Sequence, residues 1–114
     1  MVDSTHPPEV DRIAASRKAV AARRARASLK RDVSTRVVTP QDVLHRAFDD
    51  PASAAGTLRV TEFLTALPAI GVGQRDRVLE ELGISPVKRI GGLGVRQRDA
   101  LSRWLDGRFP EPMP

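Results

Sequence analysis

Glycine and arginine occur close together in residues 67–77, in an order that suits the binding of a phosphate group. The segment runs Leu-Pro-Ala-Ile-Gly-Val-Gly-Gln-Arg-Asp-Arg. Pro68 has no N–H and disfavours the helical conformation of the residue before it, so one helix must end at Leu67. The next helix begins a few residues later, and the amides of its first turn have no acceptor inside the helix. Such amides, at the positive end of the helix dipole, form a site for an anion.

Two glycines determine which amides this hairpin exposes. Gly71 and Gly73 permit positive φ, because glycine adopts it without steric cost, and they bring bare backbone amides to the surface. Arg75 adds a full positive charge nearby. An ordinary turn between two helices, with arginine on its surface, fits the same residues. The predicted phosphate contacts are Gly71, Val72, Gly73, Gln74 and Arg75.

A second glycine-rich loop repeats this pattern nearer the C-terminus. Ile-Gly-Gly-Leu-Gly at residues 90–94 precedes a helix predicted over residues 96–105, which Gly107 would end. Basic side chains flank this loop on both sides, so we predict a second phosphate site there. The predicted contacts are Lys88, Arg89, Gly92, Gly94 and Arg96.

The longest predicted helix covers residues 8–33 and carries the whole excess charge of the chain. Residues 9–33 contain eight Lys or Arg and three Asp or Glu, whereas the rest of the chain contains eleven of each sign, and the net charge is +5. This clustering predicts a basic arm that binds a polyanion, although a solvated helix whose arginines only raise solubility fits the same pattern. Its apolar positions are few, so only part of it can pack on a core. The predicted contacts on this arm are Arg23, Arg24, Arg26, Lys30 and Arg31.

Short helices must position these basic segments. Thr39-Pro40-Gln41-Asp42 predicts a helix start with Thr39 as N-cap, and that helix would end before Pro51. Residues 52–57 are small and are expected to be flexible, with Gly56 turning the chain. Two further helices, starting at Val60 and after Gly71, would form the hairpin described above. The second of these would stop at Gly83, in the C′ position.

The apolar residues of these helices predict one small core. Expected core residues are Val43, Leu44, Ala47, Phe48, Phe63, Leu64, Leu67, Val78, Leu79, Leu82, Val95, Ala100, Leu101, Trp104 and Leu105. The expected divisions are a flexible N-terminus at 1–7, the basic helix at 8–33, a linker and short helix at 34–57, a two-turn module at 58–107 and a disordered tail at 108–114.

Several classes of protein are disfavoured by the composition. Cysteine is absent, so disulfides and cysteine zinc sites are excluded. His6 and His45 are isolated and no carboxylate pair emerges, so we expect no enzyme, no metal, no cofactor and no small-molecule substrate. No apolar run approaches the roughly 20 residues of a membrane span, so we expect a cytoplasmic protein that does not enter a membrane. A monomer is expected.

Three segments, in their order along the chain, carry a resemblance to a known family. They are Arg-Arg-Ala-Arg-Ala from residue 23, Leu-Thr-Ala-Leu-Pro-Ala-Ile-Gly from residue 64, and Gly-Leu-Gly-Val-Arg-Gln from residue 92. Over residues 14–109 the sequence closely resembles the actinobacterial integration host factors. The Leu-Pro-x-Ile-Gly piece alone occurs in many helix-hairpin-helix proteins, whereas the combined order is more specific.

The resemblance implies an all-α fold, in which a long basic N-terminal helix precedes a compact helix-two-turn-helix bundle. It also implies a nucleoid-associated protein that binds double-stranded DNA with little or no sequence preference and bends or organises it. Assistance to integration, replication or transcription belongs to the same expectation. Two other hypotheses stay open from the residues alone: a protein that binds structured RNA, and an adaptor that binds another protein through its long helix.

Four positions depart from the pattern of this family. Ala69 stands where the hairpin usually has glycine, and Val72 and Gly73 stand where a basic residue is common. Gly91 interrupts the basic run before Gly-Leu-Gly. These departures predict a divergent relative whose contact with DNA is weaker or altered.

Overall fold

The computed structural model describes residues 8–110, and every regular element in that part of the chain is a helix. The all-α class expected from the sequence is confirmed. The flexible N-terminus expected at residues 1–7 and the end of the expected tail, residues 111–114, lie outside the described residues.

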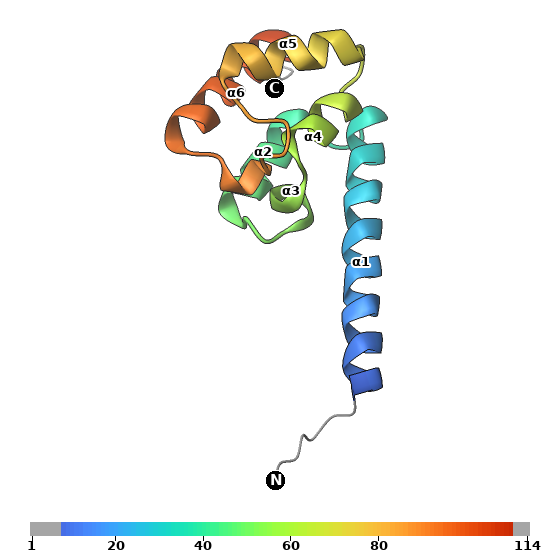
Figure 1. Ribbon diagram of the computed structural model, residues 1–114. Helices are drawn as coiled ribbons and strands as arrows, with labels where there is room; N and C mark the ends of the chain where they lie inside the picture. Colours follow the sequence, from blue (N-terminus) through green and yellow to red (C-terminus); the bar gives the residue numbers. More distant parts are fainter. Residues whose placement is uncertain (1–7, 111–114) are drawn as a thin grey trace.

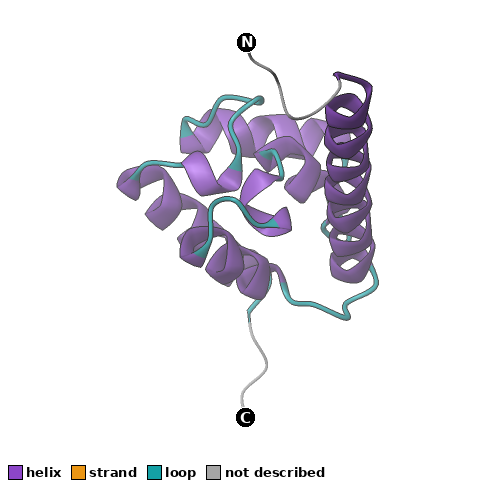
Figure 2. Cartoon of the chain, turned by 90° about the horizontal axis from the view of Figure 1, so that it is seen from below, coloured by secondary structure: helices purple, strands orange, loops and turns teal. Residues whose placement is uncertain are grey.

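Helix α1 (Pro8–Ser34) projects from the globular part of the molecule as a long rod, as Figure 1 shows. Only its C-terminal end is buried: Leu29 and Val33 lie in the core, whereas Val10 and Ile13 are half exposed. The other helices all lie to one side of α1 (Figure 2). The prediction that only part of this helix packs on a core is confirmed.

Helix α2 (Pro40–Asp49) begins where the sequence predicts. Thr39 is the N-cap, and its Oγ1 accepts a hydrogen bond from the N–H of Asp42 at 3.1 Å. Such a cap contributes about 1 kcal/mol to the stability of a helix. The residues that α2 buries are Gln41, Val43, Leu44 and Ala47.

The segment 52–57 is not the flexible turn that the sequence predicts. Its last four residues form helix α3 (Ala54–Thr57), and Ser53 Oγ caps this helix by accepting a hydrogen bond from the Gly56 N–H at 3.1 Å. Gly56 is helical and buried, and a Cβ at this position would collide with the backbone of Pro51. The glycine is therefore required for close packing, and the predicted turn at Gly56 is wrong.

Helices α4 (Val60–Ala66) and α5 (Val72–Leu82) form the hairpin that the sequence predicts, and its glycines do not use the positive φ that they permit. Gly71 is the N-cap of α5 with φ −87°, and Gly73 lies inside the first turn of α5. The residue with positive φ is Ala69, at 64°. Neither Gly71 nor Gly73 has positive φ, because the chain reverses direction at residues 68–69, before either glycine.

Replacing Ala69 with glycine is expected to stabilise the protein. The left-handed conformation costs an alanine about 1–2 kcal/mol, and the greater freedom of glycine in the unfolded chain offsets part of that gain. We expect the melting temperature to rise by about 2–4 °C. Ala100→Gly, in the interior of a helix with ordinary φ, is the matched control and should lower it. A lower melting temperature for Ala69→Gly would contradict the strain at this position.

The 3-10 helix η1 (Ile90–Gly92) and helix α6 (Val95–Arg108) complete the fold. The predicted end of α6 at Gly107 is wrong, because Gly107 lies inside the helix and Phe109 is the C-cap. A single glycine costs a helix only about 1 kcal/mol, which packing beyond it can offset. Val95 was expected in the core but is 82% exposed, since it is the first residue of α6 and points away from the bundle.

The start of the predicted disordered tail is ordered. Gln41 is buried, and its Nε2 donates a hydrogen bond to the carbonyl oxygen of Phe109 at 2.5 Å. The ring of Phe109 meets that of Trp104 edge to face, with 6.3 Å between the centroids. These contacts hold the end of α6 against the start of α2.

One core of aliphatic side chains and one phenylalanine joins these helices. Gly83 ends α5 with φ 66°, as the sequence predicts. Of the residues expected inside, Phe48, Leu82 and Trp104 pack on the edge of the core. The largest fully buried side chains are Phe63, Leu58, Leu64, Ile90, Leu101 and Leu105.

Candidate nucleic-acid interface

A short extended pairing brings two arginines from distant parts of the chain together. The N–H of Val60 donates to the carbonyl of Lys88 at 2.9 Å, and the N–H of Ile90 donates to the carbonyl of Leu58 at 2.9 Å. Arg59 and Arg89 lie opposite each other in this isolated antiparallel bridge. Buried neighbours fix the two backbones, so both exposed guanidinium groups are held on one side of the pairing.

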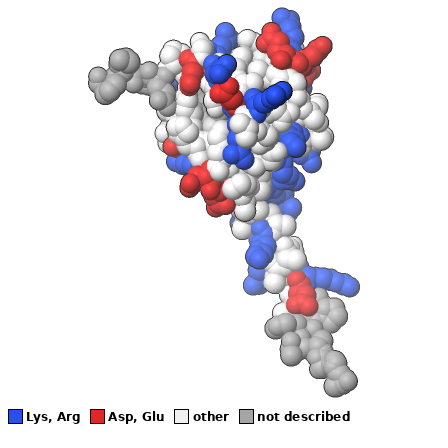
Figure 3. Space-filling view, turned by 90° about the vertical axis from the view of Figure 1, so that its left-hand side faces the viewer, with Lys and Arg blue, Asp and Glu red and all other residues white. Residues whose placement is uncertain are grey.

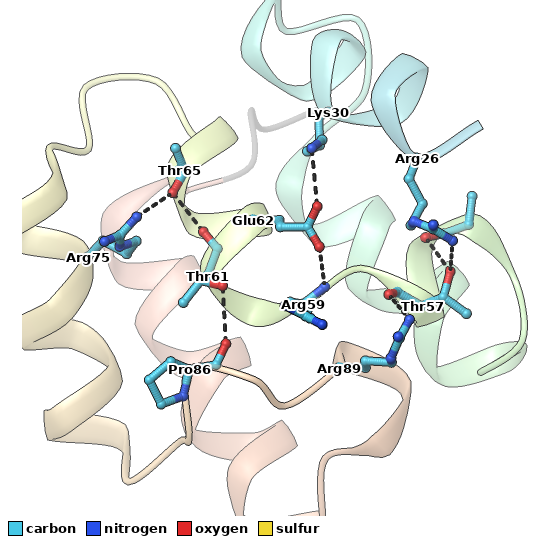
Figure 4. Close-up of polar contacts among 11 residues, drawn as sticks. Arg26, Lys30, Thr57, Arg59, Thr61, Glu62, Thr65, Arg75, Pro86 and Arg89 are labelled. Carbon is cyan, nitrogen blue, oxygen red and sulfur yellow. Dashed lines mark hydrogen bonds and ion pairs between the residues drawn. The ribbon is translucent and has the colours of Figure 1, made fainter. Parts of the chain in front are cut away.

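Helix α1 meets this pairing at its buried end. Arg26 Nη1 lies 3.4 Å from Thr57 Oγ1, and Arg89 Nη1 donates to the Thr57 carbonyl oxygen at 2.9 Å (Figure 4). Lys30 Nζ lies 3.2 Å from Glu62 Oε2. Between α1 and the globular part is a hollow of about 360 Å³, which we call the basic groove. Its lining residues are Arg23, Arg26, Lys30, Thr57, Arg59, Glu62 and Arg89.

Glu62 is the one carboxylate that lines the basic groove. Its Oε1 also accepts a hydrogen bond from the Arg59 N–H at 3.2 Å. Burial raises the pKa of this carboxyl, but the Arg59 N–H, the Lys30 ammonium and the Arg26 charge lower it by more, so the pKa of Glu62 lies below its usual value. Glu62 therefore stays ionised at neutral pH.

The arginines of α1 divide between two faces of the helix. At 100° per residue, Arg12 and Arg23 lie within about 60° of Arg26, on the groove side. Arg24 and Arg31 lie about 140–160° from Arg26, and both are exposed on the opposite side. The sequence-based prediction placed Arg24 and Arg31 on one surface with Arg23, Arg26 and Lys30, whereas the structure separates these two arginines from the basic groove. Figure 3 shows basic side chains along α1 and over the adjoining edge of the globular part.

The hairpin site has the helix-start geometry that the sequence predicts. The first backbone hydrogen bond of α5 runs from the Arg75 N–H to the Gly71 carbonyl at 2.9 Å, which leaves the amides of Val72, Gly73 and Gln74 at the free end of the helix. Gly71 offers no side chain to cap them. These amides can donate hydrogen bonds to an anion, such as a phosphate oxygen.

The side chain of Arg75 forms contacts within the hairpin and does not extend freely into solvent. Its Nη1 donates to Thr65 Oγ1 at 3.2 Å, and its Nε lies 3.1 Å from Asp76 Oδ1. The side chain is only 25% exposed. Figure 4 shows the contact with Thr65, in which Arg75 of α5 reaches across to α4. Its positive charge still lies beside the helix start, but part of it is neutralised by Asp76.

The second glycine loop lies at the other end of α5. Gln97 Nε2 donates to the Gly83 carbonyl at 2.9 Å, which joins the start of α6 to the C-terminal end of α5. The Gly94 N–H is directed at Gln97 Oε1, 3.4 Å away, so this amide is occupied. Because α5 is about 16 Å long, Arg75 in its first turn and this loop lie at opposite ends of the helix. Lys88, Gly92 and Arg96 remain exposed around the loop.

Sequence reasoning missed Arg59, Thr57 and Glu62. The sequence contains one signal for Arg59. Leu58-Arg59-Val60 and Lys88-Arg89-Ile90 both place a basic residue directly before a β-branched apolar residue. An exposed residue followed by a buried one is typical of paired strands. Two three-residue segments are too short to predict a strand. Only the three-dimensional structure shows that they pair.

Comparison with known proteins identifies the family. A family model described as "S13-like H2TH domain" matches residues 33–104. An integration host factor of Mycolicibacterium smegmatis is 41% identical over 95 residues, which cover 83% of this chain and 89% of that protein. The chain belongs to the actinobacterial integration host factor family. Residues 8–32, which make up most of helix α1, lie outside the matched domain.

A solved structure supports the same assignment. It is described as sIHF bound to an 8bp palindromic DNA, and it matches with a TM-score of 0.69 and 31% identity over 78% of this chain and 98% of that one. A guanylate kinase of Leifsonia xyli is 48% identical over 58 residues, but these are 23% of the enzyme, so its activity does not carry over. None of the described helices has the length and apolar composition that a membrane span requires.

Proposed function

We propose that this protein binds double-stranded DNA through the phosphate backbone, with little sequence preference, and bends and organises it in the nucleoid. The observation that carries this proposal is the basic groove, where five cations from three separate segments face a hollow between the arm and the module. A groove of this composition attracts a polyanion, and arginine suits phosphate through its planar set of donors. The DNA-bound member of the family supports the choice of polyanion.

Two separate binding surfaces would hold one duplex. The module would contact phosphates through the amides of residues 72–74 at one end of α5 and through Lys88 and Arg96 at the other. The arm would contact the backbone through the groove face of α1, together with Arg59 and Arg89. No described side chains form an obvious set for reading bases, so we expect weak specificity.

Bending follows from the length of the arm. The 27 residues of α1 span about 40 Å, well beyond the globular part. DNA that curves toward the arm would make contacts that straight DNA cannot reach, and these would offset an elastic cost of roughly 1–6 kcal/mol. We infer an architectural role, because the relative that is 41% identical is an integration host factor.

A salt series tests the proposed function. Seven cations without a carboxylate partner in the described part of the chain face the two binding surfaces, so the slope of log affinity against log salt for a duplex of about 25 base pairs should be near −6. They are Arg12, Arg23, Arg26, Arg59, Lys88, Arg89 and Arg96. Duplex RNA of the same sequence is the control and should compete poorly. Salt-insensitive binding would favour the adaptor hypothesis, and equal competition by RNA would favour the RNA hypothesis.

A further inference from the structure

A single acid, Glu62, lies among the cations of the basic groove. The side chain of Glu62 is 35% exposed and that of Lys30 is 36% exposed, so both reach the surface that DNA would cover. Glu62 lies between Lys30 of α1 and the backbone of Arg59, as Figure 4 shows. Its two oxygens have different partners, and each partner suggests a different role.

The contact with Lys30 opposes DNA binding. An ammonium that neutralises Glu62 at 3.2 Å cannot also neutralise a phosphate at full strength. The carboxylate itself repels any phosphate that enters the groove. In the absence of DNA the same carboxylate reduces the repulsion among Arg26, Arg59 and Lys30, which favours the free protein. Both effects weaken DNA binding.

We propose that Glu62 is an internal counterion of the DNA-binding surface, which competes with DNA phosphate for Lys30 and so limits affinity for DNA. This inference rests on the proposed function. Lys30 then contributes little to affinity in the wild type, because Glu62 holds it. A bound duplex remains easier to release than the number of groove cations would indicate.

The contact with Arg59 must be kept constant in any test. The Arg59 N–H lies at the start of α4, and Glu62 caps it in the manner of a capping box. Glutamine retains an oxygen that can accept this hydrogen bond but carries no charge. Glu62→Gln therefore removes the counterion and keeps the cap.

The experiment measures DNA affinity across a salt series for the wild type and Glu62→Gln. We expect the variant to bind about tenfold more tightly at 0.1 M salt, with a slope steeper by about 0.9, the contribution of one additional phosphate contact. Glu80→Gln, which removes one exposed acid from the outer side of α5, is the matched control for net charge and should change affinity less than about twofold.

A second variant separates competition for Lys30 from a change in folding. Lys30→Gln alone should reduce affinity only slightly, whereas the double variant Lys30→Gln with Glu62→Gln should lose the gain of Glu62→Gln. The inference is overturned if Glu62→Gln binds no more tightly than the wild type, or if its gain persists without Lys30. If the wild type itself shows no salt-dependent binding to DNA, the proposed function fails as well, and that result is seen before any variant is compared.

Discussion

Replacing Arg12, Arg23 and Arg26 with alanine is expected to weaken binding to a DNA duplex of about 25 base pairs by roughly a hundredfold at 0.1 M salt. All three lie on the groove face of α1, and Arg23 and Arg26 line the basic groove itself. Each contact with phosphate contributes through a charge-assisted hydrogen bond and through the release of counterions. Alanine is a good helix former, so the arm should remain helical.

The same helix provides a matched control. Arg17, Arg24 and Arg31 lie on the opposite face, and replacing them with alanine removes the same charge from the same helix. If only net charge mattered, the two triple variants would bind DNA equally. We expect the loss of affinity for the opposite-face variant to be at least tenfold smaller. Fluorescence anisotropy of labelled duplex, with circular dichroism to confirm equal helix content, makes the comparison.

Gly91→Lys is expected to lower the free energy of unfolding by about 3 kcal/mol, because it forces a side chain into a packed backbone contact. A Cβ at Gly91 would lie 2.8 Å from Cα of Pro51. From the sequence, this glycine is an interruption in a basic run and predicts weaker DNA contact. The structure gives it a packing role, since η1 and the junction of α2 and α3 approach closely there. A lysine at this position would destabilise the protein instead of raising its affinity for DNA.

Gly92→Lys is the control for this prediction. The nearest atom to a Cβ at Gly92 is Cε of Lys88 at 3.9 Å, so a side chain there has space. We expect thermal unfolding of Gly91→Lys about 10 °C below the wild type and that of Gly92→Lys within about 2 °C of it. Equal melting temperatures for the two variants would show that contact with Pro51 does not constrain residue 91.

The helices could be predicted because their signals are local. Thr39 with Pro40 starts α2, Pro68 follows the end of α4, and Gly83 ends α5, each through the conformation of one or two residues. The charge of the arm is equally visible in the sequence. The sequence alone therefore indicates the family and a surface that binds phosphate.

The rest depends on contacts between distant segments, which local patterns do not show. Gly56 predicts a turn unless Pro51 is known to pack against it. Arg59 looks like an ordinary surface residue until its backbone pairs with that of Arg89. Arg24 and Arg26 look equivalent until the docked end of α1 determines which face borders the module. The sequence therefore predicts the basic residues of the candidate site but not the groove that they line.

The salt dependence of DNA binding by the two arm variants tests the central claim most directly. If the duplex lies in the basic groove, alanine at Arg12, Arg23 and Arg26 should make the slope of log affinity against log salt shallower by about 2.7, because three phosphate contacts are lost. The slope of the Arg17, Arg24 and Arg31 variant should stay close to that of the wild type. Equal changes of slope in the two variants, or a larger change in the opposite-face variant, would contradict the account.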